Sequence, residues 1–245
     1  GMTKLVFWHG WGMSPDVWTD FMKDLREVLP GDTVYEAVPL PGYAGTGLPD
    51  GDSLSSWADA LMEGMPEPIV LCGWSMGAVL ALSAACRYPE RIERLVLFGA
   101  TPCFVERHGW QAGMSQESAR HFRDGVRADP VATLRRFVAL FNRQDKQARA
   151  IVRRLSGLDI PPSPVLDAGL DFLDRADFRS LVPHIRQKVL LVHGENDPLM
   201  PPDAALWLAE NLPDATLKIL PDVAHAPFLS DSRQCARFVG AFLGD

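Results

Sequence analysis

Short apolar runs alternate along most of this 245-residue chain with longer stretches in which apolar residues recur every three or four positions. The short runs are typical of buried strands, and the longer spacing is typical of helices. Apolar strands that alternate with amphipathic helices predict a parallel sheet that is covered on both faces. The pattern predicts strands at residues 4–8, 33–38, 69–72, 92–98, 188–192 and 216–220, and helices at 16–29, 53–65 and 75–88.

The alternation stops after Ala100 and resumes at Lys188. Between residues 114 and 176 the apolar spacing is helical throughout. We therefore expect an α/β core made of residues 2–102 and 179–245, interrupted by a helical cap at residues 103–178. Within that cap the spacing predicts helices at 116–128, 130–142, 146–155 and 164–175.

The charge of the chain is unevenly distributed. The net charge of −7 argues against nucleic acid as the main partner. Residues 103–157 contain 11 Arg and Lys against 5 Asp and Glu, a balance of +6, so the remainder carries −7 − 6 = −13. A basic insert on an acidic body indicates an anionic substrate or partner.

Cysteine and histidine positions argue against a metal centre. The four cysteines form no C-x-x-C pair, and the six histidines show no H-x-x-x-H spacing. We expect free, mostly buried thiols in a reducing compartment, and neither a metal nor a cofactor. No apolar stretch approaches ~18 residues and no leader precedes the first expected strand, so we expect a cytoplasmic protein without a membrane partner.

The motif with the clearest chemistry is G-x-S-x-G at residues 73–77. It follows an expected strand and precedes a run of small residues with helical spacing, which is the context that presents a serine as a nucleophile at the top of a parallel sheet. The flanking glycines suit a serine held in strained backbone. We therefore assign Ser75 as the candidate nucleophile.

A serine needs a base, and the base needs a third group to orient it. The expected chain order on this scaffold is serine, acid, histidine. Asp197 follows the expected strand 188–192, and His225 follows the strand 216–220. We assign His225 as the general base and Asp197 as the acid, with Glu195 as the rival acid and Asp222 as a less well placed one.

A serine hydrolase also needs hydrogen-bond donors for the oxyanion. The backbone N–H of Met76, directly after the nucleophile, is one candidate. The second usually comes from the loop after an early strand, here H-G-W-G at residues 9–12, and we nominate the N–H of Trp11. His9 is expected to brace this loop rather than to act as a second base.

These landmarks together resemble the α/β-hydrolase superfamily over essentially the full length of the chain. The resemblance implies a mostly parallel sheet of about six strands, because the usual first hairpin is missing before residues 9–12. The chain is also similar to the esterases that demethylate pimeloyl-[acyl-carrier protein] methyl ester in biotin synthesis. The similarity rests on H-G-W-G at residues 9–12, L-P-G at 40–42, G-W-S-M-G at 73–77, P-C-F at 102–104, R-F-V-A-L at 136–140 and A-H-A-P-F at 224–228.

The resemblance to these esterases implies that cap arginines hold an acidic carrier protein. The matching positions are Arg136, Arg149 and Arg153. The resemblance implies a further arginine near Ala132, which the chain lacks, and Arg135 is the nearest substitute. A solvated helix face explains the same arginines equally well.

An apolar channel for an acyl chain would need a lining. Trp11, Trp74 and Phe137 are our candidates for substrate binding, although each is also a normal core residue. Their possible neighbours are Met76, Phe104 and Phe141.

Three alternatives stay open at this stage. The same triad would serve a general short-chain esterase or lipase, a thioesterase, a lactonase, a C–C bond hydrolase or a haloperoxidase-like enzyme. A non-catalytic hydrolase-fold binding protein would predict a broken triad or a blocked oxyanion loop, and the sequence shows neither. The third alternative is a cap that serves mainly to dimerise.

Overall fold

A single six-stranded sheet forms the centre of the computed structural model, which describes residues 2–157 and 159–244. Its strand order is β2-β1-β3-β4-β5-β6, and every neighbouring pair is parallel. This confirms the expected α/β class and the number of strands. The strands are β1 (Lys4–Trp8), β2 (Val34–Val38), β3 (Ile69–Trp74), β4 (Ile92–Phe98), β5 (Lys188–Gly194) and β6 (Ala215–Leu220).

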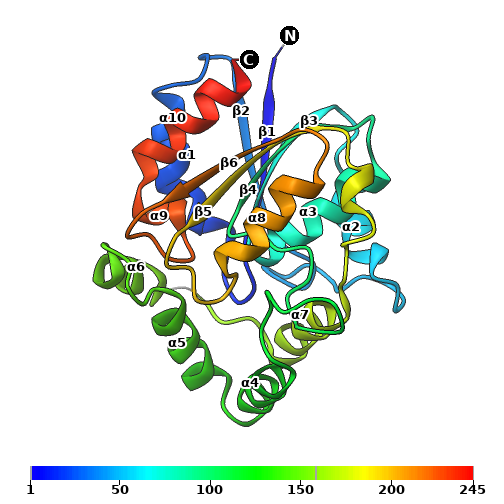
Figure 1. The fold of residues 1–245 in the computed structure, drawn as a ribbon, viewed down its shortest axis with the longest axis vertical. Helices are drawn as coiled ribbons and strands as arrows, with labels where there is room; N and C mark the ends of the chain where they lie inside the picture. Colours follow the sequence, from blue (N-terminus) through cyan, green and yellow to red (C-terminus); the bar gives the residue numbers. More distant parts are fainter. Residues whose placement is uncertain (1, 158, 245) are drawn as a thin grey trace.

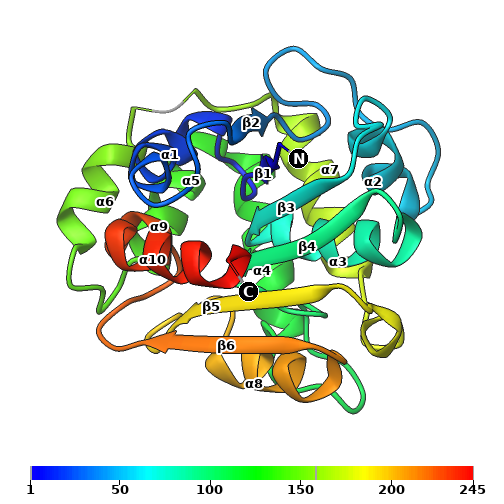
Figure 2. The ribbon, with the colours of Figure 1, turned by 90° about the horizontal axis from the view of Figure 1, so that it is seen from above.

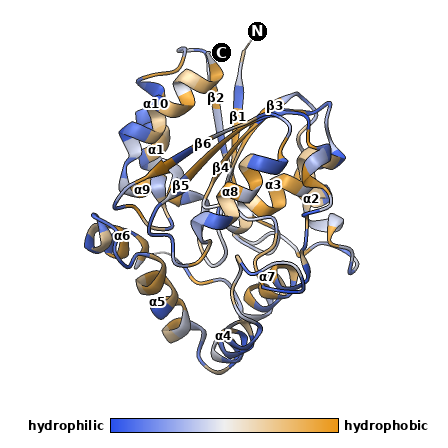
Figure 3. Cartoon of the chain, in the orientation of Figure 1, coloured by the Kyte–Doolittle hydropathy of each residue, from blue (hydrophilic) through white to orange (hydrophobic). Residues whose placement is uncertain are grey.

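The burial of the strands follows their place in the sheet. All of β3 is buried, and so is β5 after its first residue, whereas the edge strands β2 and β6 are largely exposed or half-buried. Figure 3 shows hydrophobic residues gathered on the central strands and on α3 (Met76–Arg87). Strands covered on both faces must be apolar along their whole length, which explains why they appear in the sequence as continuous apolar runs.

Helices cover both faces of the sheet. In Figures 1 and 2, α1 (Thr19–Arg26) and α10 (Ser232–Leu243) lie together on one face, and α2 (Ser55–Met62), α3 and α8 (Pro202–Asn211) lie on the other. Short helical turns precede α1 and α10, namely η1 (Pro15–Trp18) and α9 (Pro227–Ser230), and a third, η2 (Val182–His184), precedes β5.

The four helices between β4 and β5 lie at the carboxyl end of the sheet (Figure 1). The two ends of this segment meet, because Cys103 and Asp177 form an antiparallel bridge and the Phe178 N–H donates to the Pro102 carbonyl over 2.8 Å. This pairing supports our division into a core and a cap at residues 103–178, which remains a proposal. The cap helices are α4 (Gln116–Ala128), α5 (Pro130–Phe141), α6 (Ala148–Leu155) and α7 (Ser163–Arg175).

Some elements differ from the sequence pattern. The helix expected at 16–29 is a 3₁₀ turn followed by the shorter α1, because Pro15 at the start of the turn favours a tight first turn capped by Ser14. β3 continues to Trp74, so the first residues of the G-x-S-x-G motif belong to the strand. The sequence pattern also did not identify α8 and α10.

Candidate active site

Ser75 occupies a sharp turn between β3 and α3. Its backbone has φ 58° and ψ −117°, a region that residues with a side chain rarely adopt. Such strain costs about 1–3 kcal/mol and persists only where the surroundings impose it. A Cβ on Gly73 would lie 2.6 Å from the Gly77 carbonyl oxygen, and a Cβ on Gly77 would overlap the Trp8 carbonyl oxygen. The two glycines of the motif are therefore required by packing around the turn.

The structure brings Ser75, His225 and Asp197 into one hydrogen-bonded row. The Ser75 Oγ lies 2.8 Å from His225 Nε2, and His225 Nδ1 lies 2.8 Å from Asp197 Oδ2. All three residues are buried. A carboxylate facing Nδ1 requires that nitrogen to carry the proton, so Nε2 is left to accept the proton of the serine hydroxyl.

Asp197 is itself held by its surroundings. Its Oδ1 accepts hydrogen bonds from the N–H groups of Leu199 (2.9 Å) and Met200 (2.8 Å). Burial alone would raise the pKa of Asp197, but the charge and hydrogen bond of His225 outweigh it and hold this pKa below its usual range. The carboxylate is therefore ionised at neutral pH and can compensate a positive charge on His225.

The two rival acids are not in contact with the histidine. Glu195 and Asp222 are exposed, and Asp222 occupies a turn with φ 60°. Within the described part of the chain, Asp197 is the carboxylate that His225 Nδ1 meets. Of the three acids considered from the sequence, Asp197 is thus the one in place to orient the ring.

Two backbone N–H groups beside Ser75 are free to bind an anion. A Cβ on Gly10 would lie 3.3 Å from the Ser75 Cβ, so the loop of residues 9–12 lies directly against the nucleophile. The N–H groups of Trp11 and Met76 form no hydrogen bond with residues 2–157 or 159–244. Met76 is the first residue of α3, where unpaired N–H groups and the helix dipole favour negative charge. Both N–H groups nominated from the sequence are therefore available for an oxyanion.

His9 braces the loop that carries Trp11. Its Nδ1 lies 2.8 Å from the Gly10 carbonyl oxygen, and its Nε2 accepts the Leu40 N–H over 3.1 Å. The Tyr43 ring packs edge-on against the His9 ring at 4.8 Å, and its hydroxyl accepts the Gly12 N–H over 2.8 Å. The contribution of Tyr43 was not identified from the sequence.

Because His9 is buried, we expect the folded protein to lose stability in mild acid. Burial lowers the pKa of His9 from 6.5 to about 4. At pH values between these two pKa values, the unfolded chain therefore binds a proton at His9 that the folded chain does not bind. The free energy of unfolding then falls as pH decreases from about 6.5 to about 4, by up to about 3 kcal/mol. Urea unfolding at several pH values measures this slope. His9→Gln should flatten it, and an unchanged slope in that variant would show that another group is responsible.

Aromatic side chains from core and cap enclose the serine, which is only 5% exposed. The Trp11 ring packs on Phe137 of α5, with the ring centroids 5.2 Å apart, and the Trp11 Nε1 donates to the Leu166 carbonyl of α7 over 2.9 Å. The Trp74 Nε1 donates to the His225 carbonyl over 2.9 Å, and the Trp74 and Phe141 ring centroids lie 5.8 Å apart. The three residues predicted to bind substrate thus belong to the aromatic packing near the candidate site.

The basic residues of the cap divide into two groups. In the paired group, Arg123 and Arg127 of α4 meet Asp167 and Arg175 of α7 meets Asp171, whereas Arg120 of α4 has no acidic partner among the described residues. The described residues also supply no acidic partner to five arginines on α5, on α6 and in the turn between them, which we call the free arginines: Arg135, Arg136, Arg143, Arg149 and Arg153. All five of these side chains are exposed.

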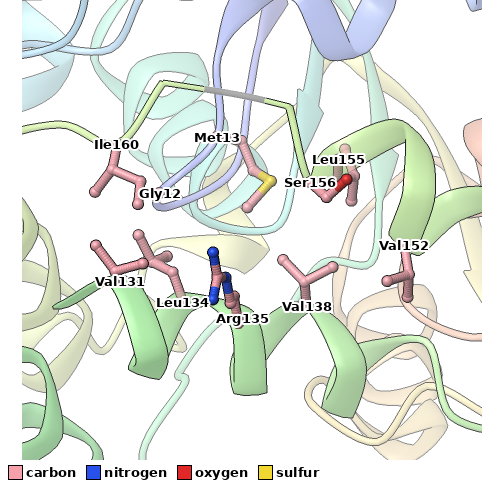
Figure 4. A pocket seen from close by; sticks show the side chains of 10 residues that line it. All are labelled: Gly12, Met13, Val131, Leu134, Arg135, Val138, Val152, Leu155, Ser156 and Ile160. Atoms are coloured by element: carbon pink, nitrogen blue, oxygen red, sulfur yellow. The ribbon is translucent and has the colours of Figure 1, made fainter. Parts of the chain in front are cut away.

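A cavity of about 320 Å³ lies between α5, α6 and the loop that follows Trp11. Figure 4 shows its apolar side chains facing one another, with the Arg135 side chain among them. Gly12 and Met13 form one wall, so the cavity borders the loop that carries the candidate oxyanion donor. Its apolar lining is Met13, Val131, Leu134, Val138, Val152, Leu155 and Ile160.

A sequence profile described as the alpha/beta hydrolase family matches residues 5–238. The chain belongs to this family. An esterase from Exiguobacterium antarcticum has the same fold, with a TM-score of 0.86 and 21% identity over 99% of this chain and 92% of that one.

Closer relatives share most of their length with the chain. A pimeloyl-[acyl-carrier protein] methyl ester esterase from Aromatoleum aromaticum is 42% identical over 95% of this chain and 94% of its own length. An esterase of the same name from Nitrosomonas europaea is 36% identical over 97% of this chain and 93% of its own length. The chain belongs to the same family as these esterases, and it is an ester hydrolase.

Residues 2–157 and 159–244 lack the features of a metal site and of a membrane span. No three His, Cys, Asp or Glu side chains there gather closely enough to hold a metal ion. No helix in that part of the chain combines the length and the apolar character needed to cross a bilayer.

Proposed function

We propose that this ester hydrolase removes the methyl group from a pimeloyl methyl ester carried on acyl-carrier protein. The observation that carries the proposal is the hydrogen-bonded row of Ser75, His225 and Asp197 in a chain that is 42% identical to an esterase of that name. Fold alone would not support it, because one fold hosts many reactions. The alternatives from the sequence are a general short-chain esterase, a thioesterase and a non-catalytic binding protein.

The reaction begins at Ser75. His225 Nε2 removes the hydroxyl proton as Oγ attacks the ester carbonyl carbon, and the N–H groups of Trp11 and Met76 stabilise the oxyanion, each by about 3 kcal/mol. The intermediate collapses, and His225 gives the proton to the departing methoxide, which leaves as methanol. Asp197 stabilises the imidazolium during both steps.

Water then completes the cycle. His225 takes a proton from a water molecule as its oxygen attacks the acyl-enzyme, and a second oxyanion forms in the same place. Collapse of this intermediate breaks the bond to Ser75 Oγ, which takes the proton back from His225. The products are the free carboxylic acid and the original serine.

The free arginines support a carrier protein as the bearer of the substrate. They lie on α5, on α6 and in the turn between them, exposed and without acidic partners in the described residues, whereas Arg123, Arg127 and Arg175 of α4 and α7 are paired within the cap. Acyl-carrier proteins are acidic, and complementary charge accelerates and orients docking.

The cavity between α5 and α6 supports a path from that surface towards the serine. Its walls are apolar, which suits an extended chain, and its inner side is the loop next to Trp11. We place the chain that joins the ester to the carrier in this cavity, with Trp11, Trp74 and Phe137 around the acyl group. We also place the enzyme in the cytoplasm, because its cysteines at 72, 86, 103 and 235 are unpaired thiols.

One comparison of substrates tests the proposed function. Hydrolysis of the pimeloyl methyl ester on acyl-carrier protein is followed by mass spectrometry beside free monomethyl pimelate and a short-chain nitrophenyl ester. We expect a strong preference for the carrier-linked ester in kcat/KM. Turnover of the nitrophenyl ester alone would leave a general esterase, and turnover of none of the three would favour a binding protein.

Charge reversal on the cap should remove that preference. In Arg136→Glu/Arg149→Glu/Arg153→Glu we expect kcat/KM for the carrier-linked ester to fall roughly 10²- to 10³-fold, because steering and docking both depend on these charges. The rate with the nitrophenyl ester should not change, since that substrate needs no docking. Steady-state rates at low and high salt measure the effect. Added salt should lower the kcat/KM of the wild type for the carrier-linked ester, because it screens the charges that steer docking.

The matched control is Lys23→Glu/Arg233→Glu/Arg237→Glu, which changes the net charge equally on exposed positions of α1 and α10. An equal loss in this control would show that net charge, not the cap surface, governs carrier recognition. Sedimentation of both triple variants tests the third alternative, a cap that dimerises. A change of mass in the cap variant alone would support dimerisation.

A further inference from the structure

Asp145 is a buried carboxylate in the cap that the proposed reaction does not use. Asp145 lies in the turn between α5 and α6 and is only 7% exposed. Its Oδ2 accepts the Ala224 N–H over 2.7 Å, and its Oδ1 accepts the Gln147 N–H and the Ser230 hydroxyl, each over 2.7 Å. Both oxygens are therefore engaged, which fixes the orientation of the carboxylate.

Two of these partners belong to the segment that carries the candidate base. Ala224 directly precedes His225, and Ser230 ends the short helix α9 that follows it. The cap reaches the same segment twice more, since the His225 N–H donates to the Phe141 carbonyl (3.2 Å) and the Lys146 N–H donates to the Asp222 carbonyl (2.8 Å). Cap residues 141–146 thus hold the segment on both sides of His225.

The core holds His225 from the opposite direction. The Trp74 Nε1 donates to the His225 carbonyl over 2.9 Å. The imidazole must meet Ser75 at one nitrogen and Asp197 at the other, each over 2.8 Å, so a small displacement of its backbone would lengthen at least one of these contacts. The position of this backbone therefore depends on the cap as well as on the core.

We propose that Asp145 is a positioning residue, which places the His225 imidazole by holding the Ala224 N–H and the Ser230 hydroxyl from the cap. This inference rests on the proposed role of His225 as the base. It makes the docked position of the cap a condition for a complete triad. A carboxylate is required there because three donors point at it, whereas an amide would direct its own N–H₂ group at one of them.

Asp145→Asn tests the proposal. With the nitrophenyl ester we expect kcat to fall about 10- to 100-fold, the loss corresponding to a hydrogen bond to a charged group, with KM little changed. The low-field proton resonance of His225 Nδ1–H should shift or broaden, which a purely structural role would not cause. Ser230→Ala removes one of the three bonds and should give a smaller effect of the same kind, so it serves where Asp145→Asn folds poorly.

The matched control is Asp129→Asn, another cap aspartate, which accepts the Ala132 N–H at the start of α5 and has no contact with the His225 segment. It should keep the kcat and the proton resonance of the wild type. Each kcat is divided by the fraction of sites that an active-site phosphonate labels. A wild-type kcat per labelled site in Asp145→Asn and Ser230→Ala, or an unchanged His225 resonance, would overturn the positioning role.

The same measurements separate this proposal from the proposed function. If Ser75→Ala hydrolyses the nitrophenyl ester as fast as the wild type, the catalytic assignment falls and the positioning role falls with it. If activity requires Ser75 but not Asp145, only the positioning role is overturned.

Discussion

Replacing Ser75 by alanine is expected to lower kcat for every ester substrate by roughly 10⁵- to 10⁶-fold. The oxyanion donors and the substrate-binding residues remain, but no nucleophile is left to form the acyl-enzyme. The remaining rate of ester hydrolysis should still exceed the uncatalysed rate in water, because the oxyanion donors and substrate binding act without the triad. Initial rates with the nitrophenyl ester, and mass spectrometry after treatment with a serine-reactive phosphonate, measure both parts of this prediction.

A second substitution at the same position separates chemistry from folding. Ser75→Gly removes the nucleophile and also the Cβ that is strained at φ 58°. The strain of about 1–3 kcal/mol exceeds the entropic cost of glycine of about 0.5–1 kcal/mol, so this variant should melt at a higher temperature than Ser75→Ala. Phosphonate labelling of Ser75→Ala at another residue would show that the nucleophile lies elsewhere.

The position of the triad was predictable because it depends on local patterns and on one rule of topology. The strain at Ser75 selects small residues two positions away on each side, and this leaves a readable motif. The carboxyl ends of β5 and β6 meet at one edge of a parallel sheet, so residues that follow these strands are brought together whatever the intervening sequence. Asp197 and His225 follow those two strands.

Contacts between cap and core were not predictable in the same way. Asp145 and Ala224 are separated by 79 positions, and no periodicity links them. An isolated aspartate between two expected helices is typical of a solvated turn, so only the structure distinguishes it from a buried acceptor of three hydrogen bonds. The same applies to Tyr43, whose hydroxyl meets Gly12 across 31 positions.

The charge of the cap was predicted in sign but not in arrangement. Counting residues 103–157 gives a basic segment, yet Asp167 and Asp171 of α7 lie beyond it and pair with Arg123 and Arg127 of α4. Helix packing, which a charge count does not include, decides which cations stay free. The structure therefore places five arginines without acidic partners on and between α5 and α6, and the charge-reversal variant acts on three of them.

The cap contacts the candidate site at two places. Phe137 of the cap packs on Trp11 in the loop beside Ser75, and Asp145 of the cap accepts the N–H of Ala224, which directly precedes His225. With the proposed roles of Asp145 and His225, a displacement of the cap that admits substrate would also loosen the candidate base. Binding of the substrate and completion of the candidate triad would then be linked through one turn between α5 and α6.

Asp197→Asn is expected to lower kcat by about 10⁴-fold while the fold is retained. The side-chain oxygen of the asparagine would keep the bonds from the Leu199 and Met200 N–H groups, which leaves its N–H₂ group facing His225 Nδ1. An amide donor there requires Nδ1 to be unprotonated, so the proton moves to Nε2, which can no longer accept the proton of Ser75.

The rival acids supply matched controls for this prediction. Glu195→Gln and Asp222→Asn change exposed carboxylates that have no contact with His225 within the described residues, so both variants should keep the wild-type kcat with the nitrophenyl ester. The three variants are compared by kcat and by the rate of phosphonate labelling, which requires the same activated serine. A large loss in Glu195→Gln together with an active Asp197→Asn would transfer the orienting role to Glu195. Such a result would require the loop after β5 to adopt a different arrangement in the working enzyme.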